Sequence, residues 1–312
     1  MDRFLLRRGI SLIFVLFSLT LLTFVVGRLA PGNPVQRMMG NRHDPVRYAE
    51  LVHQYGLDQP IWRQYGTYMA GLARGDLGLS YQYPGRRVTE ILARGVPVSF
   101  GLGGLALALS LLTGVPIGIW AALRRNRFSD RALMGLMLAL YSIPSFVLIP
   151  ILRVGDFALF QAGLPALPMA GWGAPADWVL PVLVLAAAST GYVARLTRSS
   201  MLEVLRQDYI RTARAKGLPG RTVLGTHALR NALLPIVTFL GPATAFLVTG
   251  AFVVETLFDV PGIGFLAVQS IGQRDYPVIQ GTTLLLGVAV VLMTLFTDVL
   301  YMVLDPRIRR AG

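Results

Sequence analysis

The chain has 312 residues, of which 54% are hydrophobic and 14% are charged, and its net charge is +13. Soluble domains carry roughly 25% charged residues, so this low charge content and a mean hydropathy of +0.58 indicate a membrane protein. The absence of cysteine excludes disulfides, thiolate metal sites and cysteine nucleophiles. The basic residues gather in short segments beside apolar runs, a distribution that argues against nucleic-acid binding.

Six stretches without charged residues predict six membrane-spanning helices. A helix of roughly 20 apolar residues crosses a hydrocarbon core about 30 Å thick. Six such stretches in a soluble chain would leave no polar helix faces to meet water. The fourth stretch is the shortest, but Trp178 and Tyr192 are suited to anchor its ends at the interfaces. The stretches are 9–27, 95–123, 132–152, 178–194, 231–254 and 276–297.

The first stretch has two interpretations. Arginines precede its apolar run, as in a secretory signal peptide. The run is too long for that, and it ends in Arg28-Leu-Ala-Pro without a clear small-residue cleavage site. We therefore expect residues 1–30 to form a cytoplasmic N-terminus and a retained first helix.

Residues 31–97, here called the 31–97 segment, are long and polar. Apolar anchors such as Tyr48, Trp62 and Tyr65 predict a folded segment rather than a disordered one. Its arginines say little about orientation, because long loops cross the membrane largely regardless of charge. We expect it to be extracytoplasmic, ahead of a five-helix membrane core over 98–304.

The short loops fix the orientation. Segments 124–131 and 195–230 are rich in arginine, and both termini carry further arginines. Positive residues collect on the cytoplasmic side of short loops. With six spans all of these segments fall on that side, which predicts cytoplasmic termini, including a tail over 305–312.

Several residues inside or beside the spans are candidates for special roles. Gly114 and Gly118, together with Gly101, Gly103 and Gly104, predict close packing on the second span. Four polar residues could line a pathway, because polar groups in spans are expensive; the alternative is a kink satisfied by neighbouring helices for Tyr141 and Ser142, and pairing or an interfacial position for Glu255 and Asp298. They are Tyr141 and Ser142, which with Pro144 interrupt the third span, and Glu255 and Asp298.

Residues 199–231, here called the 199–231 loop, predict a basic helix–turn–helix. Ser200-x-x-Glu203 has the form of a capping box, so we expect a helix to begin there. Gly217 follows Lys216 as at a helix C-terminus. The remaining parts are the turn Leu218-Pro219-Gly220 and a second helical stretch over 221–232.

Two functions suit this loop. Its basic residues could hold an amphipathic segment against anionic lipid. Alternatively, the small residues Thr212, Ala213, Ala215 and Gly217 would let a cytoplasmic partner approach closely.

The chain offers no constellation for covalent chemistry. The only lysine is Lys216, so a phosphate-binding Gly-x-x-x-x-Gly-Lys-Ser/Thr motif is absent. His43, His53 and His227 lie far apart in the sequence, so neither a catalytic nor a metal site is predicted, and no cofactor is expected. A secondary transporter would need buried acids near the midplane, and a channel or scaffold would show a charged ring; neither pattern is present.

The 199–231 loop resembles the cytoplasmic loop of binding-protein-dependent ABC importer permeases. Their signature is Glu-Ala-Ala, three residues, Gly, nine residues, then Ile-x-Leu-Pro. Ala213, Gly217 and Leu229 agree with it, whereas Arg211 and Arg230 replace the Glu and the Pro, as expected of the peptide-permease branch.

The resemblance extends along nearly the whole chain. It identifies a B-type subunit of the dipeptide and oligopeptide permeases. The matching stretches are Arg28 to Pro34, Gly56 to Pro60, Gly75 to Ser80, Val254 to Thr256, Pro261 to Gly264, Arg274 to Pro277, Asp298 to Tyr301 and Asp305 to Arg307.

That resemblance implies an all-α membrane protein with the type I ABC importer permease architecture. It implies a second, homologous permease subunit in a heterodimer, two cytoplasmic ABC ATPases that carry the enzymatic activity, an extracytoplasmic solute-binding protein, and membrane lipid around the helices. Di- and oligopeptides are the expected cargo, with nickel chelates, haem or glutathione as alternatives. The residues expected to couple to an ATPase are Tyr209, Arg211, Thr212, Ala213, Lys216, Gly217, Leu218 and Pro219.

Overall fold

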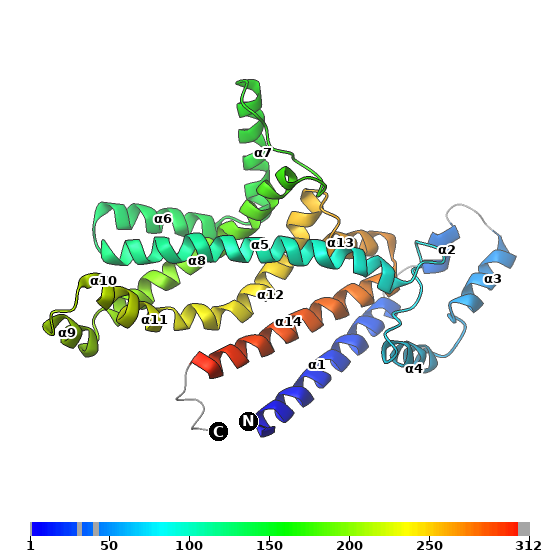
Figure 1. Cartoon of the computed structure of the whole chain (residues 1–312). Helices are drawn as coiled ribbons and strands as arrows, with labels where there is room; N and C mark the ends of the chain where they lie inside the picture. The colour runs from blue at the N-terminus through cyan, green and yellow to red at the C-terminus, as the bar shows by residue number, and fades with distance from the viewer. Residues whose placement is uncertain (1, 30–32, 40–43, 305–312) are drawn as a thin grey trace. The chain divides into compact units, whose positions relative to one another are not determined.

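The computed structural model describes residues 2–29, 33–39 and 44–304, and the regular elements of these residues are helices (Figure 1). An isolated β-bridge joins Leu79 and Arg87. Among the described residues, five helical segments are long and apolar enough to cross a membrane, and the bent pair α6 (Phe128–Ser142) and α7 (Ser145–Gln161) is a sixth candidate. The predicted all-α membrane class is therefore confirmed. The candidates are Gly9–Leu29, Val88–Leu123, Phe128–Ser142 with Ser145–Gln161, Pro175–Val204, Gly220–Gly241 and Tyr276–Thr297.

The chain divides into two units, Met1–Ser99 with Pro261–Val291 and Phe100–Val260 with Leu292–Gly312. Helices α5 (Val88–Leu123) and α14 (Tyr276–Leu304) contribute to both. The first unit also holds α1 (Asp2–Leu29), α2 (Pro34–Met39), α3 (Pro45–Gln54), α4 (Ile61–Leu72) and α13 (Ile263–Gln273). The second holds α6 (Phe128–Ser142), α7 (Ser145–Gln161), η1 (Pro175–Trp178), α8 (Val179–Val204), α9 (Asp208–Ala215), α10 (Gly220–Thr222), η2 (Val223–Ala228), α11 (Leu229–Ala232) and α12 (Leu234–Leu257).

In the first unit, the described residues of the 31–97 segment are folded, as predicted, and they form short helices with local start signals. Asp44 caps α3: its Oδ1 accepts hydrogen bonds from the backbone N–H of Val46 at 2.9 Å and of Arg47 at 3.1 Å. Pro45 stands at the first position of that helix, where its missing N–H costs nothing. Asn33 offers its side-chain oxygen to Val35 N–H, 2.9 Å away, at the start of α2.

The 31–97 segment is attached to α1 by aromatic and hydroxyl contacts. The ring of Phe24 lies 5.1 Å from that of Tyr65 on α4, and Thr20 Oγ1 lies 3.1 Å from the Tyr65 hydroxyl. Helix α14 approaches α1 at Gly27, where an added Cβ would come within 3.3 Å of the Tyr276 ring. The polar segment and two apolar spans thus share one packed interior.

Asp275 is a second attachment point. Its carboxylate is fully buried and accepts hydrogen bonds from the Ser80 hydroxyl, from Tyr81 N–H at 3.0 Å and from Gln82 N–H at 3.2 Å. Gln82 Nε2 also donates to the Gln273 carbonyl oxygen over 2.9 Å. One carboxylate thereby holds the end of the 31–97 segment to the turn before α14.

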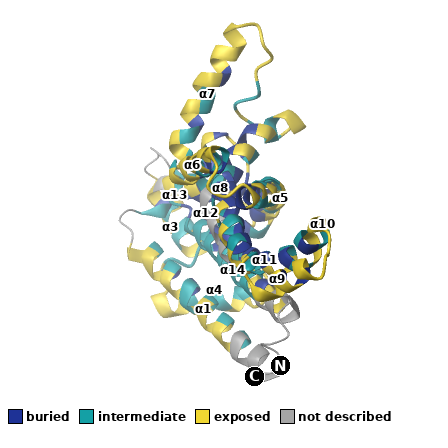
Figure 2. Cartoon of the chain, turned by 90° about the vertical axis from the view of Figure 1, so that its left-hand side faces the viewer, coloured by how far each residue is buried: buried dark blue, intermediate teal, exposed yellow. Residues whose placement is uncertain are grey.

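In the second unit, α8 is the most buried helix and packs against α6, α7 and α12 (Figure 2). A Cβ at Gly118 would come within 2.5 Å of Ala194 O, and one at Gly114 within 3.0 Å of Thr190 O. The predicted close packing is confirmed at these two glycines, which let α5 approach α8. At Gly103 and Gly104 it stays a prediction, because an added Cβ would meet nothing within 4 Å among the described residues of this chain, and Gly101 has only an ordinary contact with Trp172 at 3.9 Å.

The third predicted span is broken rather than kinked. Helix α6 ends at Ser142 and α7 begins at Ser145, at an angle of 109°. Pro144 disfavours helical conformation at Ile143, which is extended with ψ 117°. Helix α7 then leaves apolar side chains exposed, among them Val154 at 71% and Phe160 at 61% (Figure 2), a surface suited to a non-aqueous neighbour.

Candidate functional site

The 199–231 loop begins later than the capping-box pattern predicts. Ser200 is buried within the last turns of α8, which continues to Val204, so the predicted helix start at Ser200 is wrong. The next helix, α9, begins at Asp208 after the extended residue Gln207. Ser200 fits the capping pattern, but the apolar contacts of α8 extend that helix beyond Ser200.

Helix α9 has one buried and one exposed face. Ile210 is fully buried and Ala213 is 6% exposed, whereas Arg211 and Arg214 face outward. The buried pair joins a small core with side chains from α5, α8, η2 and α11. That core, here called the loop core, contains Ala122, Met201, Ile210, Ala213, Val223, Ala228 and Ala232.

Gly217 ends α9 as predicted. Its φ of +76° is left-handed, and its N–H donates to the Arg214 carbonyl oxygen at 2.9 Å. A residue with a Cβ is strained in this conformation, whereas glycine is not. An added Cβ would meet no described atom within 4 Å, so backbone conformation rather than space requires glycine here.

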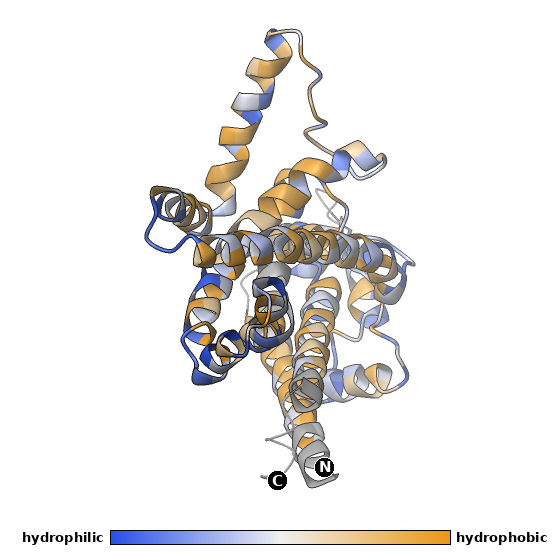
Figure 3. Cartoon of the chain, turned by 60° about the vertical axis from the view of Figure 1, so that its left-hand side comes forward, coloured by the Kyte–Doolittle hydropathy of each residue, from blue (hydrophilic) through white to orange (hydrophobic). Residues whose placement is uncertain are grey.

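The second helical stretch of the loop is also present. Short helix α10, π-helical η2 and α11 follow one another from Gly220 to Ala232. Asn231 Nδ2 donates to the Tyr209 hydroxyl at 2.8 Å and thus connects the two halves. Hydrophilic residues gather in the loops while the long helices are mostly hydrophobic (Figure 3).

The eight predicted coupling residues share one loop but not one surface. Ala213 belongs to the loop core, so it supports the surface and is not part of it. Ile210, the best-buried residue of α9, was not among the predicted residues, although its spacing of three from Ala213 is a helical signal. The exposed members are Tyr209, Arg211, Thr212, Lys216, Gly217, Leu218 and Pro219.

The four polar residues predicted near a pathway occupy different surroundings. Tyr141 and Ser142 are exposed at the end of α6, and the Tyr141 ring lies 5.9 Å from that of Tyr192 and 5.8 Å from the Arg195 guanidinium carbon. Glu255 is fully buried in α12, and its carbonyl oxygen accepts a hydrogen bond from Val260 N–H. Asp298 lies in α14, but its side chain is outside the described residues.

A buried ion pair was not predicted. Asp130, 1% exposed, accepts two hydrogen bonds from Arg198, at 2.7 and 2.8 Å, and one from Asn126 N–H at 2.9 Å. Such bidentate pairs impose geometry as well as attraction. The pair joins the start of α6 to α8 near the base of the 199–231 loop. A lone aspartate in an arginine-rich segment was the available signal.

The two histidines in the described part of the chain, His53 and His227, belong to no metal-binding cluster. His53 Nδ1 lies 3.0 Å from Asp58 Oδ2, a partner that the sequence did not indicate. His227 is half-buried in η2, and His43 is outside the described residues. No group of three or more His, Asp or Glu residues suited to a metal is found among the residues that the structure describes.

The fold is that of type I ABC importer permeases. The structure resembles a chain of the MetNI methionine ABC transporter in an inward-facing conformation, with a TM-score of 0.56, 19% identity, and coverage of 69% of this chain and 96% of that chain. It also resembles a chain of an amino acid ABC transporter solved with histidines, with a TM-score of 0.55, 17% identity, and coverage of 68% and 94%.

Sequence comparison then assigns the family. Residues 114–310 match the binding-protein-dependent transport system inner membrane component, and residues 1–98 match the N-terminal part of the corresponding membrane components. The chain therefore belongs to the family of binding-protein-dependent transport system inner membrane components.

Two relatives match over nearly their whole length. The dipeptide transport system permease protein DppB of Bacillus subtilis strain 168 is 42% identical over 309 residues, which cover 99% of this chain and 98% of the relative. The oligopeptide transport system permease protein OppB of Salmonella typhimurium strain LT2 is 41% identical over 312 residues, covering 99% and 100%.

Proposed function

We propose that the chain is a permease subunit of an ATP-driven importer of dipeptides or oligopeptides and forms half of its translocation pathway. The observation that carries this proposal is the end-to-end similarity to DppB and OppB at 42% and 41% identity. The partners would be a second, homologous permease subunit, two cytoplasmic ABC ATPases and an extracytoplasmic solute-binding protein. ATP hydrolysis would belong to the ATPases, since Lys216, the only lysine here, lies in no phosphate-binding motif.

The proposed orientation has both termini in the cytoplasm. The arginine-rich segments 124–131 and 195–230 then lie on the cytoplasmic side and the 31–97 segment on the opposite side. This division keeps 98–304 as the permease core and 305–312 as a cytoplasmic tail.

We infer that the 199–231 loop couples the permease to an ATPase. Ile210 and Ala213 fix α9 to the loop core, so a force applied to the exposed face would pass into α8 and α5 rather than bend the loop. Arg211 and Lys216 give that face a basic character suited to an acidic groove.

Charge reversal on the coupling face tests the proposal. The chain is co-expressed with the proposed partner subunits, and we measure ATPase co-purification and uptake of labelled dipeptide. Arg211→Glu should reduce both, because its side chain is 75% exposed and bonds only weakly, at 3.5 Å, to Asp208. The matched control is Arg131→Glu, an exposed arginine in another proposed cytoplasmic segment, which should retain both activities. Purification of the chain as an active transporter without ATPases would refute the proposal.

Gly217 separates backbone strain from surface contact. Gly217→Ile places a β-branched residue at φ +76° and should abolish uptake. Gly217→Asn, which tolerates the left-handed region, should retain most of it. Gly225→Ala, at an exposed glycine of η2 with nothing within 4 Å of an added Cβ, serves as the control. Full uptake by Gly217→Ile would contradict a coupling role for this turn.

A further inference from the structure

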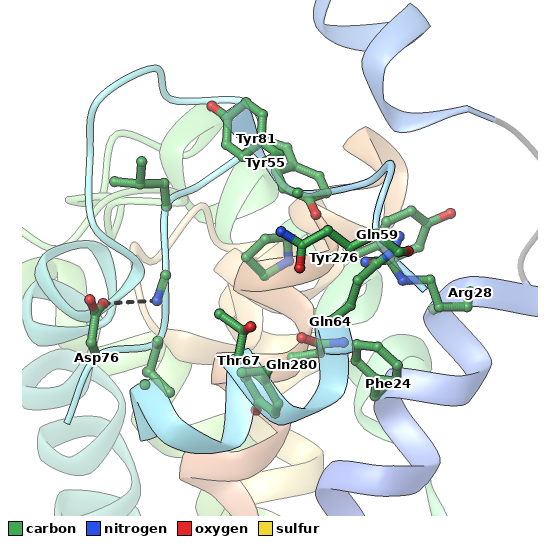
Figure 4. A pocket seen from close by; sticks show the side chains of 18 of the residues that line it. Phe24, Arg28, Tyr55, Gln59, Gln64, Thr67, Asp76, Tyr81, Tyr276 and Gln280 are labelled. Carbon is green, nitrogen blue, oxygen red and sulfur yellow. Dashed lines mark hydrogen bonds between the residues drawn. The ribbon is translucent and has the colours of Figure 1, made fainter. Parts of the chain in front are cut away.

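A pocket of about 430 Å³ lies within the first unit, where the end of α1, the 31–97 segment and the start of α14 meet (Figure 4). This volume is within the range of roughly 300–1,000 Å³ that small-molecule sites occupy. None of its lining residues belongs to the 199–231 loop or to the polar candidates described above. The pocket therefore needs an explanation of its own.

Two opposite charges face this pocket from different sides. Figure 4 shows Arg28 at the end of α1 on one side and Asp76 on the other, with Gln64, Thr67 and Gln280 between them. Arg28 is exposed, its guanidinium carbon lies 5.4 Å from the centroid of the Phe24 ring, and its side chain forms no hydrogen bond with the described residues. Asp76 uses Oδ1 to accept from Gly78 N–H at 2.9 Å, and its other carboxylate oxygen has no partner in the described part of the chain.

The wall between the charges is amphipathic. It combines glutamine amides with tyrosine rings, a lining that pairs with peptide groups and packs against side chains. Gln64 Nε2 donates to the Gln59 carbonyl oxygen at 2.7 Å, but Gln64 Oε1 and the Tyr68 hydroxyl are buried without a hydrogen-bond partner among the described residues. Burial raises the pKa of Tyr68 to about 12, so its hydroxyl keeps its proton and remains a donor. Gln64 and Tyr68 both line the pocket, and these two groups carry hydrogen-bonding capacity that the described residues leave unused.

The geometry points to a zwitterionic dipeptide or tripeptide as the ligand of this pocket, with its carboxylate at Arg28 and its ammonium group at Asp76. This inference rests on the proposed peptide cargo and adds a site on the extracytoplasmic side of the chain. A simple anion or cation would leave one of the two charges unused. A phosphatidylethanolamine headgroup is also zwitterionic, but it offers no amide groups to the glutamines, so the lining favours a peptide.

The test measures peptide binding to the assembled permease–ATPase complex in nanodiscs without the solute-binding protein. The probes are labelled alanyl-phenylalanine, its N-acetyl form and its C-amide. Because hydrogen bonds to charged groups contribute about 1.5–3 kcal/mol, each blocked form should bind at least about tenfold more weakly than the free dipeptide. Arg28→Gln should weaken the free dipeptide similarly and abolish its advantage over the C-amide. Asp76→Asn, which keeps an oxygen for Gly78 N–H, should abolish the advantage over the N-acetyl form.

Matched controls come from the same segment. Arg63→Gln removes an arginine that lies 5.0 Å from the Trp62 ring but does not line the pocket. Glu50→Gln removes an exposed acid paired with Arg47. Both variants should bind all three probes as the wild type does. If one pocket variant fails to assemble, the other decides the outcome through its own blocked probe.

The outcomes separate this inference from the proposed function. Dipeptide uptake with equal binding of free and blocked probes would overturn the pocket and leave the peptide importer intact. Charge-dependent binding without peptide uptake would support the pocket and overturn the peptide cargo. Binding is measured in nanodiscs with and without phosphatidylethanolamine. Dipeptide binding that occurs only without this lipid still supports the pocket, because the lipid headgroup then competes for it. The absence of dipeptide binding in both kinds of nanodisc overturns the pocket.

Discussion

The 31–97 segment and the 199–231 loop are both polar, yet they are attached to their helices by different chemistry. The former is held by buried polar groups, above all by Asp275 with the Ser80 hydroxyl and the Tyr81 and Gln82 N–H groups. The latter rests on the loop core, which is made of aliphatic side chains and Met201.

The difference has consequences for tolerance to change. A buried carboxylate with three donors demands one register, because the Ser80 hydroxyl and Tyr81 N–H lose their acceptor if the segment slips. An aliphatic core fixes a helix by shape and leaves its outward residues free to differ. The attachment at Asp275 is thus suited to a constant geometry, and the loop core to a surface adapted to a partner.

Removal of the carboxylate is the strongest test of the polar attachment. Asp275→Ala leaves the Ser80 hydroxyl and Tyr81 N–H without an acceptor, whereas Gln82 N–H keeps Ser80 Oγ at 3.2 Å, and we expect it to destabilise the 31–97 segment by about 3 kcal/mol. Asp275→Asn retains one acceptor oxygen and should cost about half as much. Hydrogen exchange of residues 80–83 in nanodiscs measures the effect. Unchanged protection in Asp275→Ala would show that apolar contacts alone hold the segment.

The apolar attachment is tested at Ile210. Ile210→Ala removes a fully buried side chain from the loop core and should destabilise the loop by about 3 kcal/mol. The exposed Leu218→Ala should change loop stability by less than about 0.5 kcal/mol. Hydrogen exchange across 208–232 distinguishes the two. Equal effects of the two variants would mean that α9 has no buried anchor.

The contact of α5 with α8 lies beneath the loop core. Gly118→Ala places a Cβ within 2.5 Å of Ala194 O, and we expect a loss of about 2 kcal/mol because two helix backbones must separate. Gly103→Ala is the control on the same helix, and it should be neutral or slightly stabilising, since its Cβ meets open space. Thermal unfolding of the purified chain compares them; a larger loss in Gly103→Ala would contradict this packing.

Local rules predicted part of this structure. Charge-free stretches indicated the spans, Gly217 indicated the end of α9, and Pro144 indicated the interruption between α6 and α7. Each of these depends on the residue itself and its near neighbours.

Long-range pairing was not predicted. Asp275 meets Ser80 across 195 positions, and Asp130 meets Arg198 across 68. No local pattern specifies either partner. The predicted helix start at Ser200 was wrong for a related reason. The packing of α8 extends that helix past Ser200, a residue that would otherwise cap a new helix. The same limit applies to the pocket, because Arg28 and Asp76 come together only through the fold.

The smallest expected effect concerns the exposed pair His53 and Asp58, at the turn between α3 and α4. The hydrogen bond from His53 holds the pKa of Asp58 below its ordinary value of 3.8. A carboxyl group whose pKa is lowered in the folded state stabilises the fold at pH values above its ordinary pKa. This stabilisation is lost as the pH falls through the pKa of the folded state. In His53→Ala the turn should therefore open at a higher pH than in the wild type. Hydrogen exchange at Leu57 N–H measures this opening, because that group donates to Val52 O at 2.8 Å in the folded turn. Arg47→Ala, which breaks the neighbouring exposed pair with Glu50, is the control and should leave the acid response of the turn unchanged. If His53→Ala and the wild type opened at the same pH, the contact between His53 and Asp58 would contribute nothing to the turn. The polar attachment of the 31–97 segment would then depend on its buried groups alone.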